Sequence, residues 1–155
     1  MHQVPIRGVA LAMNEAVGVI GVAAPTELPL LGFISLMAPA IACGNTVVVI
    51  PSETQPLAVT DFYQVLETSD VPAGVVNIVT GHRDELSKTL AEHDDVDAIW
   101  YFGDAPGVKA SELASTGNMK QTWCEPPGRD WTDPSQGAGR EFLRRSSQVK
   151  NIWIP

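Results

Sequence analysis

Basic residues are scarce in this sequence. Its 155 residues include 10 Lys and Arg against 18 Asp and Glu, and the formal net charge at pH 7 is −8. The basic residues are scattered along the chain until Arg140, Arg144 and Arg145. A protein that binds DNA or RNA needs a basic stripe that neutralises phosphates, and this sequence has none. We therefore expect no nucleic-acid partner.

Cysteine is also scarce, with only Cys43 and Cys124. They lie far apart, with no CxxC pattern and no nearby histidine pair, which argues against a disulfide framework or a zinc site. A secretory signal is not expected, because Asn14 and Glu15 interrupt the apolar run that follows Arg7. These features favour a reducing compartment, and we expect a cytoplasmic protein without a bound metal.

Long hydrophobic runs are limited to one segment, residues 28–50, which has no charged residue and is long enough to cross a bilayer. Gly44-Asn45 divides it into an apolar stretch, 30–43, and a β-branched run, 46–50. Gly-Asn is a helix-stop signal, and a run of valines is typical of a strand. We therefore predict a helix, a turn and a buried strand, with no membrane partner. An integral membrane protein that uses this segment is the competing interpretation.

The first 124 residues alternate short apolar runs with longer amphipathic ones. Most of the short runs are apolar or β-branched throughout, which is typical of strands buried on both faces of a parallel sheet. This alternation predicts a doubly wound α/β fold with a mostly parallel sheet. Pro39 lies inside the first expected helix and should bend or split it. The expected strands are 17–23, 46–50, 75–79, 98–102 and 119–124, and the expected helices are 30–43, 57–68, 84–93 and 106–116.

The composition changes after residue 124. Residues 125–148 are rich in Pro, Gly and Arg and hold only Trp131, Phe142 and Leu143 as large apolar side chains. Such a stretch buries little surface to offset its ordering entropy, which predicts a flexible linker. The chain is thus expected to divide into an α/β domain over 1–124, this linker, and an apolar segment over 149–155 that can pair as an edge strand.

Ligands of a doubly wound sheet bind at the carboxyl ends of its strands, so chemistry is expected in the loops that follow them. These loops are residues 25–29, 51–56, 80–81 and 103–107. The patterns GxGxxG and GxxxxGKS or GxxxxGKT do not occur, so the common glycine-rich phosphate cradles are absent.

Two runs carry a family resemblance. Residues 39–48, PAIACGNTVV, are similar to the stretch that joins a helix to a buried strand in the nucleotide-binding half of the aldehyde dehydrogenase superfamily. Residues 72–81, PAGVVNIVTG, resemble that family's most recognisable run, and the likeness covers about residues 17–120. The resemblance implies a Rossmann-like sheet, descent from oxidoreductases that act on aldehydes, and NAD or NADP as the family's cofactor.

Within the superfamily, residues 18–22, 37–42 and 100–103 look most like the C-terminal aldehyde-dehydrogenase-like region of family 16 members. On this resemblance the chain is the C-terminal piece of a longer protein, and the family's nucleophilic cysteine lies beyond it. Neither Cys43 nor Cys124 is expected to replace that cysteine, because neither has a histidine close in sequence to lower its pKa.

Two carboxylates stand near the family's catalytic positions. Glu27 replaces an asparagine that, in the resemblance, helps to hold the substrate oxyanion, and a carboxylate there opposes the developing negative charge. Glu27 otherwise fits a solvent-facing residue at the start of a helix. Glu125 falls near the family's general base, but Pro126 and Pro127 replace the glycines that should follow it, so a general-base role is not favoured.

The cofactor contacts implied by the resemblance are degenerate. Glu53 matches a ribose-binding glutamate, but Ile50 replaces its partner lysine, and Glu53 also fits ordinary N-terminal helix chemistry. Gly103 matches the glycine beside the pyrophosphate, and Asp104 replaces the serine after it. A carboxylate about 4 Å from a phosphate charge costs about 4 kcal/mol at an effective dielectric of about 20. Asp104 is better suited to cap the helix that opens at Pro106.

Two functions remain open from the sequence. The first is a catalytically incompetent aldehyde-dehydrogenase-like domain that serves assembly, as a homo-oligomer or with a protein partner. The second is a domain that supplies NAD to an active site elsewhere in a longer aldehyde dehydrogenase. No cofactor is expected to bind tightly. An apolar patch on the first helix, formed by Leu31, Phe33, Ile34 and Met37, is expected to stay uncovered and to drive self-association.

Overall fold

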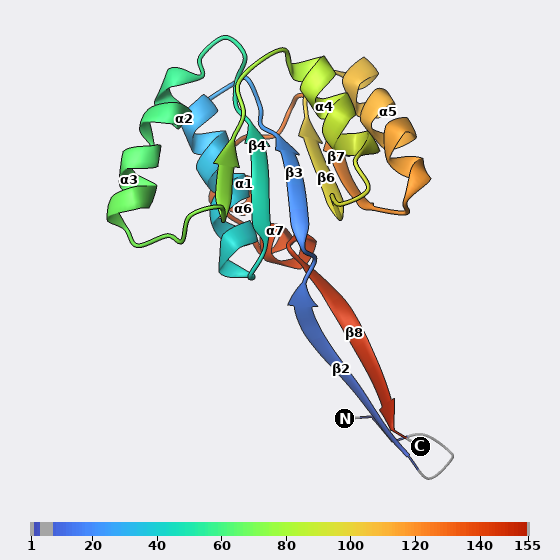
Figure 1. Cartoon of the computed structure of the whole chain (residues 1–155). Helices are drawn as coiled ribbons and strands as arrows, with labels where there is room; N and C mark the ends of the chain where they lie inside the picture. The colour runs from blue at the N-terminus through green and yellow to red at the C-terminus, as the bar shows by residue number, and fades with distance from the viewer. Residues whose placement is uncertain (1, 4–7, 155) are drawn as a thin grey trace.

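The computed structural model describes residues 2–3 and 8–154, and its centre is a five-stranded sheet (Figure 1). The strand order is β5-β4-β3-β6-β7, and every neighbouring pair runs parallel. The α/β fold with a mostly parallel sheet is therefore confirmed. The strands are β3 (Val19–Ala23), β4 (Thr46–Ile50), β5 (Val76–Ile78), β6 (Ala98–Phe102) and β7 (Gln121–Glu125).

Helices cover both faces of this sheet (Figure 1). α1 and α7 pack together on one side, and α4 and α5 pack together on the other. Gly21 of β3 faces Leu90 of α4, whereas its neighbour Val22 belongs to the core cluster on the α1 side. The helices are α1 (Pro29–Ala42), α2 (Leu57–Asp61), α3 (Tyr63–Thr68), α4 (Arg83–Glu92), α5 (Ala105–Ala114), α6 (Pro134–Gly137) and α7 (Arg140–Arg145), with a 3-10 turn, η1 (Ser115–Gly117).

The uncharged segment 28–50 forms a helix, a turn and a strand, as its sequence predicts. α1 ends at Ala42, a turn follows, and β4 begins at Thr46. Pro39 lies inside α1, which continues through it rather than splitting. Among the helices in the described part of the chain, none is long and apolar enough to cross a membrane.

The apolar patch expected on α1 is mostly covered. Phe33 and Met37 are buried in the main core, and Phe33 packs edge-on against Phe62 with ring centroids 5.7 Å apart. Leu31 is exposed and Ile34 is partly buried. The expectation of a continuous uncovered surface is therefore wrong, because α2 and the residues that follow it pack against α1.

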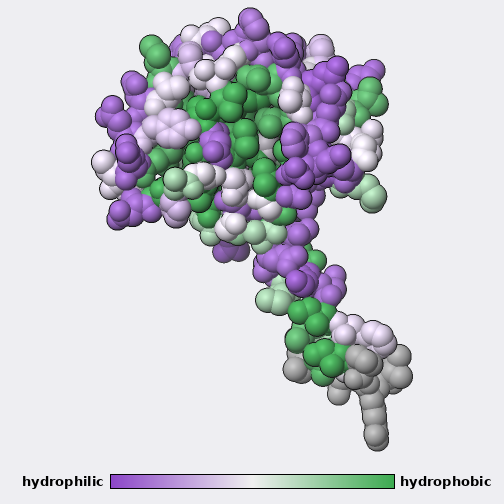
Figure 2. Space-filling model, in the orientation of Figure 1, coloured by the Kyte–Doolittle hydropathy of each residue, from purple (hydrophilic) through white to green (hydrophobic). Residues whose placement is uncertain are grey.

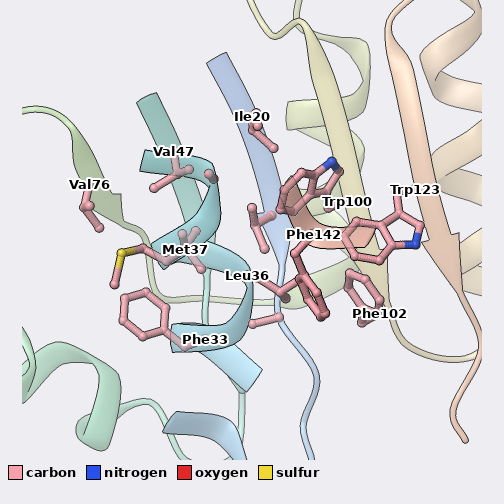
Figure 3. Packing of buried hydrophobic residues seen from close by; sticks show 14 of the residues in the cluster. Ile20, Phe33, Leu36, Met37, Val47, Val76, Trp100, Phe102, Trp123 and Phe142 are labelled. Carbon is pink, nitrogen blue, oxygen red and sulfur yellow. The ribbon is translucent and has the colours of Figure 1, made fainter. Parts of the chain in front are cut away.

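Residues 125–148 carry regular structure, although their composition predicts a flexible linker. Trp131 is 5% exposed and Phe142 is 1% exposed, and both pack into the main core. They join Phe102 and Trp123 in a cluster of edge-to-face aromatic pairs. Figure 3 shows Phe102, Trp123 and Phe142 of this cluster. A few buried aromatic rings remove enough apolar area from water to order a segment of polar average composition. This segment is therefore part of the α/β domain.

A narrow antiparallel arm projects from the domain (Figure 1). We define the arm as β2 (Val9–Ala16) and β8 (Ser147–Ile154), which pair along their whole length, from Ala16 opposite Ser147 to Val9 opposite Ile154. β1 (His2–Gln3) pairs with the outer end of β2. The apolar segment 149–155 thus lies in a strand up to Ile154, while Pro155 lies outside the described residues. The sequence did not predict β2.

Asn45 holds the base of the arm. Its buried side chain donates from Nδ2 to the carbonyl oxygens of Ala40, at 2.9 Å, and Ser146, at 2.7 Å. Its Oδ1 accepts a hydrogen bond from the backbone amide of Gly18, at 2.9 Å. Gly18 adopts a φ of +130°, which favours glycine. One side chain therefore joins α1, the start of β8 and the entry to β3.

Candidate functional site

The carboxyl ends of β3 and β6 form the centre of the candidate site. β4 follows β3 towards one edge of the sheet, and β7 follows β6 towards the other edge, so the order of the strands reverses between β3 and β6. Ligands of doubly wound sheets bind in the crevice at such a reversal. The loops here line a hollow of about 30 Å³, whose walls include Pro25, Glu27, Gly103 and Arg129. Pockets for small molecules usually measure about 300–1,000 Å³, so this hollow has room for little more than a water molecule.

The crevice itself holds the side chain of Arg83, from the first turn of α4. This residue is only 8% exposed. Its guanidinium donates hydrogen bonds to the carbonyl oxygens of Ala23, Ala24 and Phe102, at the ends of β3 and β6, and the contact with Ala23 measures 3.2 Å. The guanidinium carbon lies 4.7 Å from the ring centroid of Tyr101. A cation of the chain itself therefore occupies the reversal point.

Sequence reasoning missed Arg83. It directly precedes the expected helix 84–93, where a charged residue is ordinary. Its partners lie 19 to 60 residues away along the chain. No local pattern reports such distant backbone contacts, so only the fold reveals them.

Glu53 lies at the N-terminus of α4. One carboxylate oxygen accepts a hydrogen bond from the backbone amide of Arg83, at 3.2 Å, and the other lies 3.0 Å from Nδ1 of His82. The Arg83 amide, and after it His82, hold the pKa of Glu53 below its ordinary value. Glu53 therefore accepts a hydrogen bond from an amide at the helix N-terminus, where an anionic ligand would otherwise bind.

Asp104 caps α5, as its sequence predicts. Its Oδ1 accepts a hydrogen bond from the backbone amide of Gly107, at 3.0 Å, and the hydroxyl of Tyr101 lies 3.4 Å from the same oxygen. Burial raises the pKa of Tyr101, which keeps its hydroxyl a donor at neutral pH. A Cβ at Gly103 would lie 2.9 Å from Nη2 of Arg83, so the backbone passes too close for any other residue type without a shift. The N-termini of α4 and α5 thus each carry a carboxylate of the chain itself.

Glu125 ends β7, one residue later than the expected end of that strand. Both of its oxygens accept hydrogen bonds from Arg129, at 2.6 and 2.8 Å, and one also accepts from Nε1 of Trp123, at 2.7 Å. Burial opposes its ionisation, but the hydrogen bonds from Arg129 and Trp123 prevail and hold its pKa below the ordinary value. A carboxylate that is engaged in this way is a poor proton acceptor near neutral pH.

The remaining candidates are Glu27 and the two cysteines. Glu27 is exposed at the rim of the hollow, as its solvent-facing alternative predicts. Burial raises the pKa of Cys124 to about 11. Cys43 follows the last residue of α1 rather than lying within it, and its Sγ is 3.9 Å from the carbonyl oxygen of Leu143 at the amino end of the sheet. The predicted carboxylates therefore lie at the carboxyl edge of the sheet. Cys43 lies at the opposite edge, and the thiol of Cys124 is protonated near neutral pH.

Known proteins match this chain closely enough to identify its family. The sequence model of the aldehyde dehydrogenase family matches residues 2–132. The chain is 36% identical over 121 residues to the NADP/NAD-dependent aldehyde dehydrogenase PuuC of Escherichia coli, covering 77% of this chain and 24% of that protein. It is 41% identical over 124 residues to 2-hydroxymuconic semialdehyde dehydrogenase of a Pseudomonas species, covering 77% and 26%.

Solved structures share the fold. An indole-3-acetaldehyde dehydrogenase in complex with NAD+ superposes with a TM-score of 0.76 at 33% identity, over 82% of this chain and 26% of that one. A betaine aldehyde dehydrogenase variant from Staphylococcus aureus, also in complex with NAD+, superposes with a TM-score of 0.78 at 28% identity, over 83% and 26%. The chain thus spans about a quarter of the length of these relatives.

Proposed function

This chain belongs to the aldehyde dehydrogenase family, and we propose that its residues form a catalytically incompetent domain that serves assembly or partner binding. The finer assignment, to the C-terminal region of family 16 members, rests on the runs at 18–22, 37–42 and 100–103. A cytoplasmic location is proposed with it, on the cysteine usage of the sequence.

The chemistry of the candidate residues supports catalytic incompetence. Covalent attack on an aldehyde needs a thiolate, and a thiol with a pKa of about 11, as in Cys124, is almost wholly protonated near pH 7. Glu125 is held as an ionised partner of Arg129. In the family resemblance, Glu27 takes the place of an asparagine that helps to hold the substrate oxyanion, and a carboxylate cannot donate the hydrogen bonds needed there.

The residues at the carboxyl edge do not fit NAD. The pyrophosphate of a dinucleotide carries negative charge and lies at the reversal point of such sheets. Here Arg83 fills that point, and its Nη donors are turned to backbone carbonyl oxygens. Glu53 and Asp104 each accept a hydrogen bond from one amide, at the N-termini of α4 and α5. An incoming phosphate would therefore compete with these two carboxylates for the amides and be repelled by their charge.

The exposed apolar surface of the arm is the observation that carries the assembly role. Met13, Val149, Trp153 and Ile154 are all more than half exposed, and Trp153 reaches 61%. Figure 2 shows apolar side chains gathered on the arm, away from the domain. A two-stranded ribbon is marginally stable by itself in water, so contact with another surface would stabilise it. A second copy or a protein partner that covers these side chains supplies such a contact.

Sedimentation of purified protein tests the assembly role. We expect wild type to self-associate at micromolar concentration and Trp153→Ser to weaken that association about tenfold or more. Leu113→Ser on α5 is the matched control, because Leu113 is 69% exposed on the domain surface. A monomeric wild type that Trp153→Ser leaves unchanged would contradict the proposal.

The second candidate function is NAD binding on behalf of an active site elsewhere in a longer aldehyde dehydrogenase. Its support is the fold shared with structures solved in complex with NAD+. Calorimetric titration with NAD and NADP separates the two functions. We expect no binding tighter than about millimolar, equivalent to about 4 kcal/mol; micromolar binding would favour the second function.

A further inference from the structure

We propose that the crevice between the carboxyl ends of β3 and β6 is a binding site for a guanidinium cation, which the chain fills with its own Arg83. The cradle consists of the carbonyl oxygens of Ala23 and Ala24 on one side and of Phe102 on the other. All three accept hydrogen bonds from the Nη groups. The site therefore selects a cation at the place where nucleotide-binding members of this fold class accept an anion.

The ring of Tyr101 forms the floor of the cradle. The guanidinium carbon lies 4.7 Å from its centroid, within cation–π range. Tyr101 in turn is 1% exposed and lies beneath the start of α5. A planar cation with several donors in one plane matches this arrangement better than a compact ammonium does.

Two glycines shape the cradle. A Cβ at Gly103 would lie 2.9 Å from Nη2 of Arg83, and a Cβ at Gly107 would lie 1.9 Å from the hydroxyl oxygen of Tyr101. The backbone is thus closely fitted around the side chains of Arg83 and Tyr101. This fit distinguishes a built site from a long side chain that lies on a surface by chance.

Carboxylates lie beside the crevice. Glu53 and Asp104 accept hydrogen bonds from the amides beside it, and the charge of Asp84 acts on Tyr101. Burial of an arginine is unfavourable unless its charge is compensated, and three carbonyl dipoles with nearby carboxylates provide that compensation. An anion in the same place would face all of these groups. The crevice therefore disfavours a dinucleotide pyrophosphate even when the arginine side chain is removed.

Chemical rescue tests the site directly. Arg83→Ala should lower the melting temperature by several degrees, and millimolar methylguanidinium should restore part of the loss, because it keeps the Nη donors that make every contact. Tetramethylammonium has the same charge without donors and should restore nothing. Arg144→Ala is the matched control, since Arg144 is exposed on α7, and should neither lose stability nor respond. An unchanged melting temperature for Arg83→Ala, or equal responses to both cations, would overturn the proposal.

A second measurement needs only folded wild type. Nitrogen-resolved NMR of arginine side chains should show slow rotation about the Cζ–Nη bonds of Arg83, because both Nη groups are anchored. The Arg144 groups should rotate fast, and an Arg83→Lys spectrum supplies the assignment. Rotation of the Arg83 groups as fast as those of Arg144 would overturn the proposal, whether or not Arg83→Ala folds. The inference does not rest on the assembly role, which the arm variants test separately.

Discussion

Arg129 donates two hydrogen bonds to Glu125, from Nε at 2.8 Å and from Nη2 at 2.6 Å. Its guanidinium carbon lies 5.3 Å from the ring centroid of Trp123. The pair anchors the segment that follows the sheet to the last strand of the sheet. Nη2 of Arg129 also reaches Glu141 of α7, at 3.2 Å. The same contacts that order this segment hold the pKa of Glu125 below its ordinary value.

We expect Glu125→Gln to lower the free energy of unfolding at neutral pH by about 2 kcal/mol, because it weakens a charge-assisted pair that is largely buried. The pKa of Glu125 is lower in the folded than in the unfolded chain. Its carboxylate therefore stabilises the fold above the ordinary value of 4.5, and this contribution is lost as the pH falls through the folded-state pKa.

Urea unfolding of both proteins at about pH 7 and about pH 3 checks this expectation. The wild type should be more stable than the variant at the higher pH, and the difference should shrink at the lower pH. Glu92→Gln is the control, because Glu92 forms only an exposed pair with Lys88, 3.8 Å long. A difference that is independent of pH would show that the carboxylate charge is not the cause.

We expect Asn45→Ala to destabilise the fold by roughly 2–4 kcal/mol, because it removes three side-chain hydrogen bonds, including those to the Gly18 amide and the Ser146 carbonyl oxygen near the base of the arm. Asn151→Ala, at an exposed position in β8, should change the free energy by less than about 0.5 kcal/mol. Urea unfolding compares the two. Equal effects would mean that the Asn45 bonds contribute no more than an ordinary surface amide.

Phe142→Ala should cost roughly 3–5 kcal/mol, because it removes a fully buried ring from the aromatic cluster. Its neighbour Leu143 is 49% exposed, so Leu143→Ala should cost less than about 1 kcal/mol. Limited proteolysis adds a direct readout, because the Phe142 variant should be cut within residues 125–148 much faster than wild type. Rapid cleavage within these residues in the wild type would contradict this expectation and support the flexible linker that the composition predicts.

Cys124 should be alkylated slowly near neutral pH. With a pKa of about 11, roughly one thiol in a thousand is ionised at about pH 8. A Cys43→Ser variant isolates this thiol, and its iodoacetamide rate should rise about tenfold per pH unit up to about pH 10. Free cysteine is the reference, because its rate levels off near its pKa of about 8.5. A plateau for Cys124 below about pH 9 would show an activated thiolate and reopen the question of catalysis.

Local patterns were enough to predict much of the sheet and one cap. β4 is a run of β-branched residues and β6 is a continuous apolar run, so consecutive residues predict both strands. Asp104 caps α5 through an amide only three residues away, which is a contact that neighbouring residues decide. The family resemblance likewise rests on short runs of consecutive residues, 39–48 and 72–81, which can be recognised without the structure.

Long-range contacts decided the rest. β2 gains its pairing from β8, more than 130 residues away, and Trp131 and Phe142 are buried only because β6 and β7 present aromatic partners to them. Arg83 lies in the crevice because β3 and β6 end side by side there and present backbone carbonyl oxygens to its guanidinium. Hydrogen bonding and burial depend on which groups lie close together in space. Patterns of neighbouring residues along the chain do not predict contacts between residues that are far apart in the sequence.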